Sequence, residues 1–172
     1  MDQLFVVAWQ YVVGIVESED LPMRAAELLA AGLDSLALRD LAGRGKSEIT
    51  TELSELFRQA VHELGESMPS KETAERCLLH HLAGQLAAGT KTPGEVAARV
   101  WQGLTSAQTG AEREFLQAVG DEYYVDYIAD HQPDAFRAWE TELRFAAQRL
   151  SGTTATEIRA LQERSEEDCR PK

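Results

Sequence analysis

A Thr-x-x-Glu pattern that begins α-helices occurs three times in this chain, at residues 92–95, 109–112 and 154–157. In this capping box the threonine hydroxyl accepts a hydrogen bond from the backbone N–H of the glutamate. The glutamate carboxylate in turn accepts one from the N–H of the threonine. Both bonds satisfy amides that the start of a helix would otherwise leave without partners. The pattern therefore predicts three helix starts.

Apolar residues at helical spacing predict further helices. The clearest covers residues 47–65, where an apolar face lies opposite an acidic one. Ser47 is its expected N-cap, and Gly65 is the glycine expected to end it. Similar stripes predict helices over residues 18–32, 35–42, 71–89 and 133–150.

Two further segments are also predicted to be helical. Residues 4–16 are rich in valine, which suits a strand, but the apolar residues as far as Ile15 also fall at helical spacing, and we favour a buried helix. Behind the second capping box, the stripe of Leu116, Val119, Tyr123 and Tyr127 predicts one continuous helix that carries both tyrosines on its apolar face.

The whole pattern indicates an all-α fold. After the first run no segment alternates with period two, and all the connections are short. We therefore expect a compact single-domain bundle of about eight helices. Residues 1–162 would form this domain, and the charged residues 163–172 are expected to be a disordered tail.

The charge of the chain restricts its partners. Asp and Glu number 29 against 17 Lys and Arg, which gives a formal net charge of −12. Nucleic acid and anionic membranes are poor partners for such a chain, whereas a basic protein is a favourable one. The apolar run at 4–16 is shorter than the roughly 20 residues of a membrane helix and has no basic flank. We expect a cytoplasmic protein.

Cys77, His80 and His81 are candidates for metal or thiol chemistry, because they lie within little more than one helical turn and Cys77 and His81 share a face. A structural zinc site needs four ligands and a catalytic one usually three, so we predict no metal. No phosphate loop, serine elbow or zinc-protease motif is present, and we expect neither enzymatic activity nor a cofactor. A small-ligand pocket between helices near Cys77, His81 and the tyrosines stays an alternative.

The segment Gly32-Leu33-Asp34-Ser35-Leu36 resembles the Asp-Ser-Leu motif of acyl and peptidyl carrier proteins. The resemblance implies that Ser35 would carry phosphopantetheine at the start of a helix. The same residues also suit a tight helix-turn-helix connection, in which Gly32 ends one helix and Asp34 or Ser35 caps the next. Carrier function at Ser35 is therefore an alternative hypothesis.

A wider stretch, from Asp20 to Gly43, resembles the amino-terminal part of small all-helical actinobacterial proteins of unknown function. The likeness extends to the segment TPGEVAARVW at residues 92–101. It implies an all-helical fold and no particular activity.

The leading functional hypothesis rests on one acidic helix. Glu122, Asp126 and Asp130 follow one another at four-residue spacing, an arrangement that costs a helix roughly 0.2–0.5 kcal/mol per like-charged pair. A basic partner would relieve this repulsion, and the neighbouring Tyr123 and Tyr127 are suitable interface anchors. We therefore predict a non-enzymatic protein-interaction module, of a kind that includes immunity and antitoxin-like proteins. A solvated acidic face without any partner is the competing interpretation.

Overall fold

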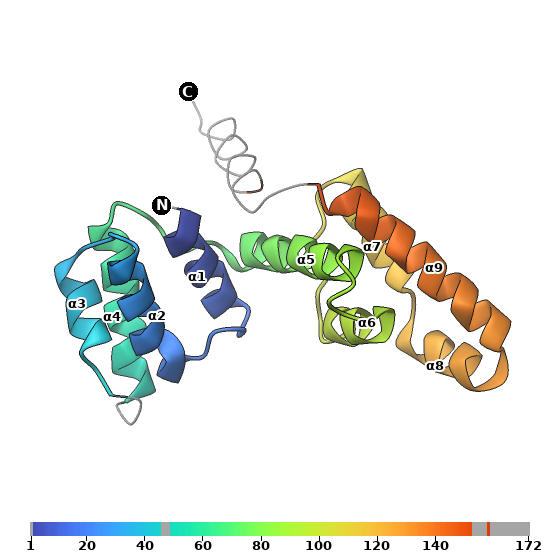
Figure 1. Cartoon of the computed structure of the whole chain (residues 1–172), viewed down its shortest axis with the longest axis horizontal. Helices are drawn as coiled ribbons and strands as arrows, with labels where there is room; N and C mark the ends of the chain where they lie inside the picture. The colour runs from blue at the N-terminus through green and yellow to red at the C-terminus, as the bar shows by residue number, and fades with distance from the viewer. Residues whose placement is uncertain (1, 46–48, 153–157, 159–172) are drawn as a thin grey trace, which may run out of the picture. The chain divides into compact units, whose positions relative to one another are not determined.

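The computed structural model describes residues 2–45, 49–152 and 158. In these residues it contains nine α-helices, one short 3₁₀ helix and no strand (Figure 1). The predicted all-α helical bundle is confirmed. The chain divides into two compact units, Met1–Ala74 and Glu75–Lys172, which are called unit 1 and unit 2 below.

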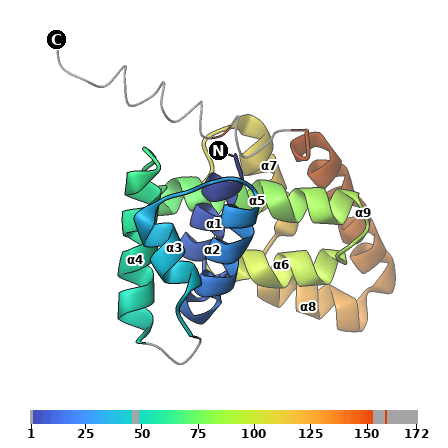
Figure 2. The ribbon, with the colours of Figure 1, turned by 60° about the vertical axis from the view of Figure 1, so that its left-hand side comes forward.

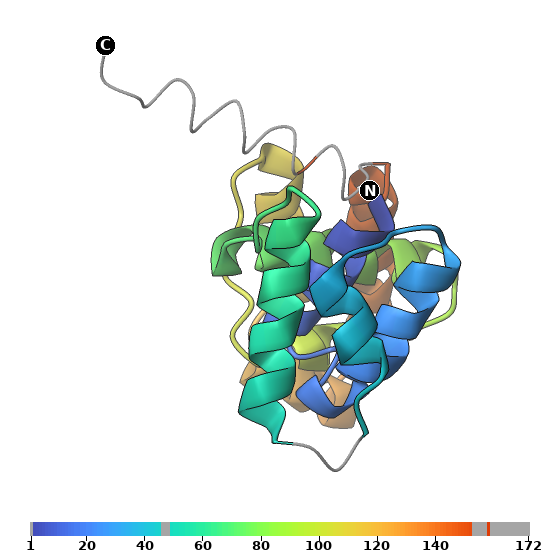
Figure 3. The ribbon, with the colours of Figure 1, turned by 90° about the vertical axis from the view of Figure 1, so that its left-hand side faces the viewer.

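Unit 1 packs its helices around one apolar core. Helix α3 contacts both α2 and α4, and Figure 2 and Figure 3 both show it between them. The core includes Leu4 from the first helix, Leu38 from α3 and Phe57 from α4, each no more than 1% exposed. The elements are α1 (Asp2–Val12), η1 (Ser18–Asp20), α2 (Leu21–Ala30), α3 (Leu36–Ala42) and α4 (Thr50–Glu63).

The first apolar run is a helix, as predicted, but it is shorter than expected. Helix α1 ends at Val12, and Gly14 follows with a φ of 70°, a conformation that glycine adopts without steric cost. Ile15 therefore lies beyond the helix and is 41% exposed, so its predicted place on the buried stripe is wrong.

Unit 2 is built mainly from helices of the second half of the chain. Helix α6 contacts α7, α8 and α9, and α9 also packs along α7 and α8. Helix α5 crosses the boundary between the two units. The elements are α5 (Lys71–Ala87), α6 (Pro93–Trp101), α7 (Gly110–Val119), α8 (Glu122–His131) and α9 (Pro133–Leu150).

Two of the three capping boxes are confirmed. At the start of α6 the Thr92 hydroxyl accepts from the Glu95 N–H at 3.3 Å, and the Glu95 carboxylate accepts from the Thr92 N–H at 2.8 Å. Thr109 and Glu112 make the same reciprocal pair at the start of α7. The third box, at residues 154–157, lies outside the described residues.

Other predicted helix ends fall outside the described part or are shifted. Ser47 and the tail at 163–172 are not among the described residues. Helix α4 begins at Thr50, with Ile49 in the N-cap position and no side-chain cap. In the part of the chain that is described, no helix combines the length and the apolar character needed to cross a bilayer.

The continuous helix predicted behind Thr109 is interrupted. Gly120 has φ 72° and ψ −170°, a region that is essentially reserved for glycine, and it separates α7 from α8. The interruption changes the helical register, so Val125 and Ile128 are the buried residues of α8. The prediction that Tyr123 and Tyr127 lie on the apolar face is therefore wrong.

Replacing Gly120 by alanine should destabilise the protein by about 1–3 kcal/mol, because alanine strongly disfavours this backbone conformation. The added Cβ would meet no atom closer than 3.8 Å, so backbone strain rather than a clash should cause the loss. Urea denaturation followed by circular dichroism would measure it. Gly84→Ala is the matched control, because Gly84 lies inside α5 with open space around it and should gain about 0.5–1 kcal/mol. A Gly120→Ala variant as stable as the parent would contradict this account.

Candidate functional site

Helix α8 presents the predicted acidic and aromatic surface. The carboxylate of Asp121 caps the helix by accepting a hydrogen bond from the Tyr124 N–H at 3.2 Å. Val125 and Ile128 are buried, at 4% and 1% exposure, and the helix packs against α6 and α9. The remaining circumference of α8 faces outward.

The acids and the tyrosines form two adjacent rows on α8. An α-helix turns by about 100° per residue, so side chains four residues apart lie nearly above one another. Glu122, Asp126 and Asp130 make one such row, about 12 Å long. Tyr123 and Tyr127 each follow an acid by one residue and make the parallel row beside it. The described structure thus brings all five predicted site residues onto one exposed helix surface. This surface, with Tyr124, is called the α8 surface below.

The tyrosines of the α8 surface are strongly exposed. Tyr123 is 82% exposed, Tyr124 57% and Tyr127 46%. The Tyr127 ring stacks on His131, with ring centroids 4.7 Å apart and an angle of 16° between the planes. Aromatic rings left in water keep a large apolar area available for burial by a partner.

The segment that contains α8 carries acidic residues and no lysine or arginine. Residues 121–134 contain five acidic residues and no lysine or arginine. Asp134 at the end of this segment pairs with Arg137 in the next turn of α9. Among the described residues, Glu122, Asp126 and Asp130 take part in no ion pair. Their mutual repulsion is therefore not offset by an arginine or lysine in the described part of the chain.

Two tryptophans donate hydrogen bonds to the turn at Val119 and Gly120, between α7 and α8, which is called the corner below. The indole N–H of Trp139, on α9, donates to the Val119 carbonyl at 3.1 Å. The indole N–H of Trp101, at the end of α6, donates to the Gly120 carbonyl at 3.0 Å. These two hydrogen bonds hold consecutive carbonyls from two different helices, and they therefore fix the direction in which α8 begins.

A buried ionic cluster supports α7, the helix before that corner. Glu112 is fully buried, and its Oε1 accepts from Arg76 Nε and from His80 Nε2, both at 2.9 Å. Its Oε2 accepts from the backbone N–H groups of Gln108 and Thr109, at 2.7 and 2.8 Å. Arg76 is itself only 2% exposed. The single carboxylate therefore caps α7 and ties it to α5.

Opposing effects act on the pKa of Glu112. Burial raises it, but the hydrogen bonds from His80, from the Thr109 and Gln108 amides and from Arg76 outweigh burial and lower the pKa to about 2. Glu112 is thus charged at neutral pH and stabilises the fold as an anion.

In the sequence, Glu112 is recognisable only as the last residue of a capping box, and His80 only as a candidate ligand beside Cys77 and His81. The contact of Glu112 with Arg76 and His80 was not predicted, because these residues precede it by 36 and 32 residues and lie on another helix. A possible signal was the placing of Arg76 and His80 four residues apart in an otherwise apolar part of α5. That spacing puts both side chains on the buried side of the helix.

Ser35 has a structural role in this fold. Its backbone is extended, and its hydroxyl accepts from the Leu38 N–H at 3.2 Å, so Ser35 is the N-cap of α3. The preceding Gly32 has a φ of 90°, as the glycine at a helix end often does. Asp34 pairs instead with Arg39. The choice between Asp34 and Ser35 as the cap is therefore settled, whereas modification of Ser35 stays a prediction.

The surroundings of Cys77 and His81 do not favour thiol or metal chemistry. Cys77 is 2% exposed, and burial raises the pKa of its thiol to about 12, which leaves almost no thiolate at neutral pH. His81 lies on the outer side of α5, and partial burial followed by the charge of Lys91 lowers its pKa. In the described residues, no three His, Cys, Asp or Glu side chains gather where they could hold a metal ion.

No protein-family model, curated protein or solved structure matches this chain. The resemblances of residues 32–36 and 20–43 to known families therefore stay predictions.

Replacing Glu112 by glutamine should destabilise the protein by about 3 kcal/mol at pH 7, because it leaves Arg76 buried without its anion. The pKa of Glu112 is lower in the folded chain than in the unfolded one, so its stabilisation is complete above about pH 4.5 and is lost as the pH falls towards 2. The difference between Glu112→Gln and the parent should shrink over that range. Urea denaturation at a series of pH values would measure it.

Glu95→Gln is the matched control for Glu112, because it removes the same carboxylate from the exposed capping box of α6. Its effect at pH 7 should be much smaller. Equal losses in the two variants would mean that capping, rather than the buried ion pair, accounts for the contribution of Glu112.

Ser35→Ala should cost about 1 kcal/mol through loss of the cap, whereas Ser35→Asn should keep most of the stability, since asparagine caps well. Denaturation of both variants would test this structural role. Carrier function has a separate test: incubation of the parent protein with coenzyme A and a phosphopantetheinyl transferase should add the mass of phosphopantetheine, and neither variant should gain it. A parent chain that gains no mass would contradict the carrier hypothesis.

Proposed function

We propose that this chain is a non-enzymatic protein-interaction module that binds a basic protein through the α8 surface. The observation that carries the proposal is the exposure of three tyrosines, by 46% to 82%, beside a row of three acids that has no ion pair within the described part of the chain. A face that served only to keep the protein in solution would need the acids but not the aromatic rings.

The tyrosines account for affinity. Tyrosine is among the residues most often found at binding hot spots, because it buries a large area at a small cost in side-chain entropy. The two rows lie on a regular helix whose starting corner is held by Trp101 and Trp139. A rigid surface loses little further freedom on binding, so more of the contact energy is available for affinity.

The acids account for the choice of partner. A net charge of −12 attracts a basic surface over a long range, and the unpaired row gives that attraction a local target. Arginine suits such a surface best, because its guanidinium can pair with a carboxylate and stack on a neighbouring tyrosine ring. The partner should therefore present arginines within an apolar surround.

An immunity or antitoxin role is the specific form of this proposal. A small acidic protein can neutralise a basic toxin by covering its cationic surface, which needs complementary charge and no catalytic group. The predicted cytoplasmic location belongs to the same proposal.

A photoreactive amino acid at position 127 should crosslink the partner in cells, and mass spectrometry would then identify it. We expect a basic protein and a crosslink to the face that presents its arginines. The affinity of the purified chain for the identified partner should then fall at least tenfold when Glu122, Asp126 and Asp130 are replaced by the corresponding amides. Tyr123→Ala with Tyr127→Ala should weaken it by a factor of about 30, as expected for hot-spot residues.

The matched control makes the same change in charge on unit 1, with Glu17, Glu19 and Glu52 replaced by glutamine. Those residues are also exposed. This variant should keep most of the affinity, because the three charges that it removes do not belong to the α8 surface. If the two triple variants lose affinity equally, overall charge and not the α8 surface governs binding, and the proposal fails.

A further inference from the structure

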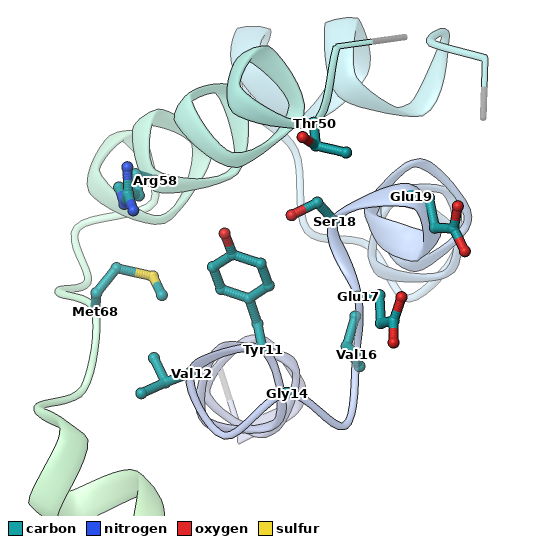
Figure 4. A pocket seen from close by; sticks show the side chains of 10 residues that line it. All are labelled: Tyr11, Val12, Gly14, Val16, Glu17, Ser18, Glu19, Thr50, Arg58 and Met68. Carbon is teal, nitrogen blue, oxygen red and sulfur yellow. The ribbon is translucent and has the colours of Figure 1, made fainter. Parts of the chain in front are cut away.

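Unit 1 contains a pocket of ≈ 650 Å³ among α1, η1 and α4 (Figure 4). The hydroxyl groups of Tyr11 and Ser18 beside it are both bonded to Ser54, at 2.8 and 3.1 Å. Arg58 lines the side near Tyr11, whereas two glutamates line the other side. Charges of both signs therefore surround the pocket, and it favours no single class of ligand. The α8 surface of unit 2 offers a more specific arrangement.

His131 continues the row of tyrosine rings on α8. It follows Tyr127 by four residues, as Tyr127 follows Tyr123, and each such step advances about 6 Å along the helix axis. The imidazole is exposed, and it stacks on the Tyr127 ring with the centroids 4.7 Å apart. Three rings therefore stand beside three acids, and each ring follows an acid by one residue.

One hydrogen bond determines which ring nitrogen of His131 carries the proton. Nδ1 lies 3.0 Å from the backbone carbonyl oxygen of Tyr127. A carbonyl oxygen can only accept, so Nδ1 must be the donor in this bond. In the neutral imidazole the other nitrogen, Nε2, is then an acceptor. Within the described part of the chain, Nε2 of His131 has no hydrogen bond.

A neutral His131 thus adds an uncharged acceptor to the α8 surface, directly after the acid Asp130. Arginine has five N–H donors in a planar fork, so it suits a surface on which carboxylates and an imidazole acceptor lie side by side. The stacked rings of Tyr127 and His131 can also be covered by a partner together. The neutral form should therefore favour binding of a basic protein.

Protonation reverses this contribution. Both nitrogens of an imidazolium are donors, so the protonated ring cannot accept from an arginine, and its positive charge repels one. Histidine side chains ordinarily change charge between pH 5 and 8, whereas carboxylates ordinarily stay ionised over that range. A protonated His131 would place a cation inside the acidic surface and partly neutralise the field that attracts a basic partner.

The charged groups on the two helices that pack against α8 are engaged elsewhere. At the start of α9, Asp134 pairs with Arg137. On α6, Arg99 donates to a glutamine in the next turn, and Glu95 closes the capping box of that helix. None of these four side chains makes a hydrogen bond or an ion pair with His131 within the described residues.

We infer that His131 is a further contact residue of the α8 surface and makes the binding of a basic partner depend on pH. In its neutral form Nε2 accepts a guanidinium N–H, and in its protonated form the ring weakens binding. The inference rests on the proposed function, because it assigns a regulator to the same surface.

A capped peptide that repeats Arg-Leu-Ala-Ala is a suitable probe, because arginine stays charged and nothing else in the peptide titrates. Its binding to the full-length chain would be measured by two-dimensional NMR at constant ionic strength, at about pH 5.5 and about pH 8. The peptide should bind about twofold to fivefold more tightly at the higher pH, as expected for one exposed charge. The stabilisation by Glu112 is complete above about pH 4.5, so the chain should be folded at both values.

Two variants would assign the effect to His131. His131→Gln stays neutral and should bind the peptide equally at the two pH values, close to the parent chain at the higher one. His131→Lys carries a fixed charge and should bind at both values as weakly as the parent does at the lower one. The matched control is His62→Gln, because His62 is also an exposed histidine in the last turn of a helix, but on α4 of unit 1. It should keep the pH dependence of the parent.

The outcomes separate this inference from the proposed function. Equal binding to the parent at the two pH values, or a His131→Gln variant that keeps the full difference, would overturn the inference alone. A His62→Gln variant that loses the difference would do the same, because another histidine would then be responsible. If the peptide binds the parent at neither pH, the α8 surface does not recognise arginines, and the inference and the proposed function fail together.

Discussion

The arrangement of unit 2 depends on the ion pair and the hydrogen bonds of one buried carboxylate, that of Glu112. An isolated charge in the interior would be strongly unfavourable, but Arg76, His80 and two backbone amides surround this one and keep it ionised. The same side chain caps α7 and joins it to α5. The position of α7 in turn fixes the corner at Gly120, whose carbonyl and that of Val119 are held by two tryptophans. The direction of the chain at that corner determines which face of α8 is exposed.

The α8 surface and the pocket of unit 1 differ in shape. The α8 surface is a convex helix face, where a macromolecule can cover both the row of carboxylates and the row of tyrosine rings. The pocket is concave and ≈ 650 Å³ in volume, and the hydroxyl groups of Tyr11 and Ser18 beside it are bonded to Ser54. A net charge of −12 draws cations towards the chain as a whole, so only local geometry can make the α8 surface selective for one partner.

Most of the helices could be predicted from the sequence because their signals are local. The capping boxes at Thr92 and Thr109, the glycine at position 32 and the apolar stripe of α4 each act within a few residues. The errors occurred where apolar residues continued past the end of a helix. Ile15 and the tyrosines after Gly120 both match a helical repeat, yet a glycine with positive φ stands before each of them. Periodicity alone cannot show that the backbone has changed direction.

The sequence by itself determined an all-helical chain, its acidic charge and the five residues of the predicted α8 surface, because helical spacing alone places those residues on one face. Only the tertiary structure decided that Val125 and Ile128 rather than the tyrosines are buried, since burial depends on which side of α8 meets α6 and α9. It also decided that Glu112 meets Arg76 and His80, and that Tyr11 and Ser18 meet Ser54. Those partners lie between 32 and 43 residues apart in the sequence, and contacts over such distances leave no local pattern.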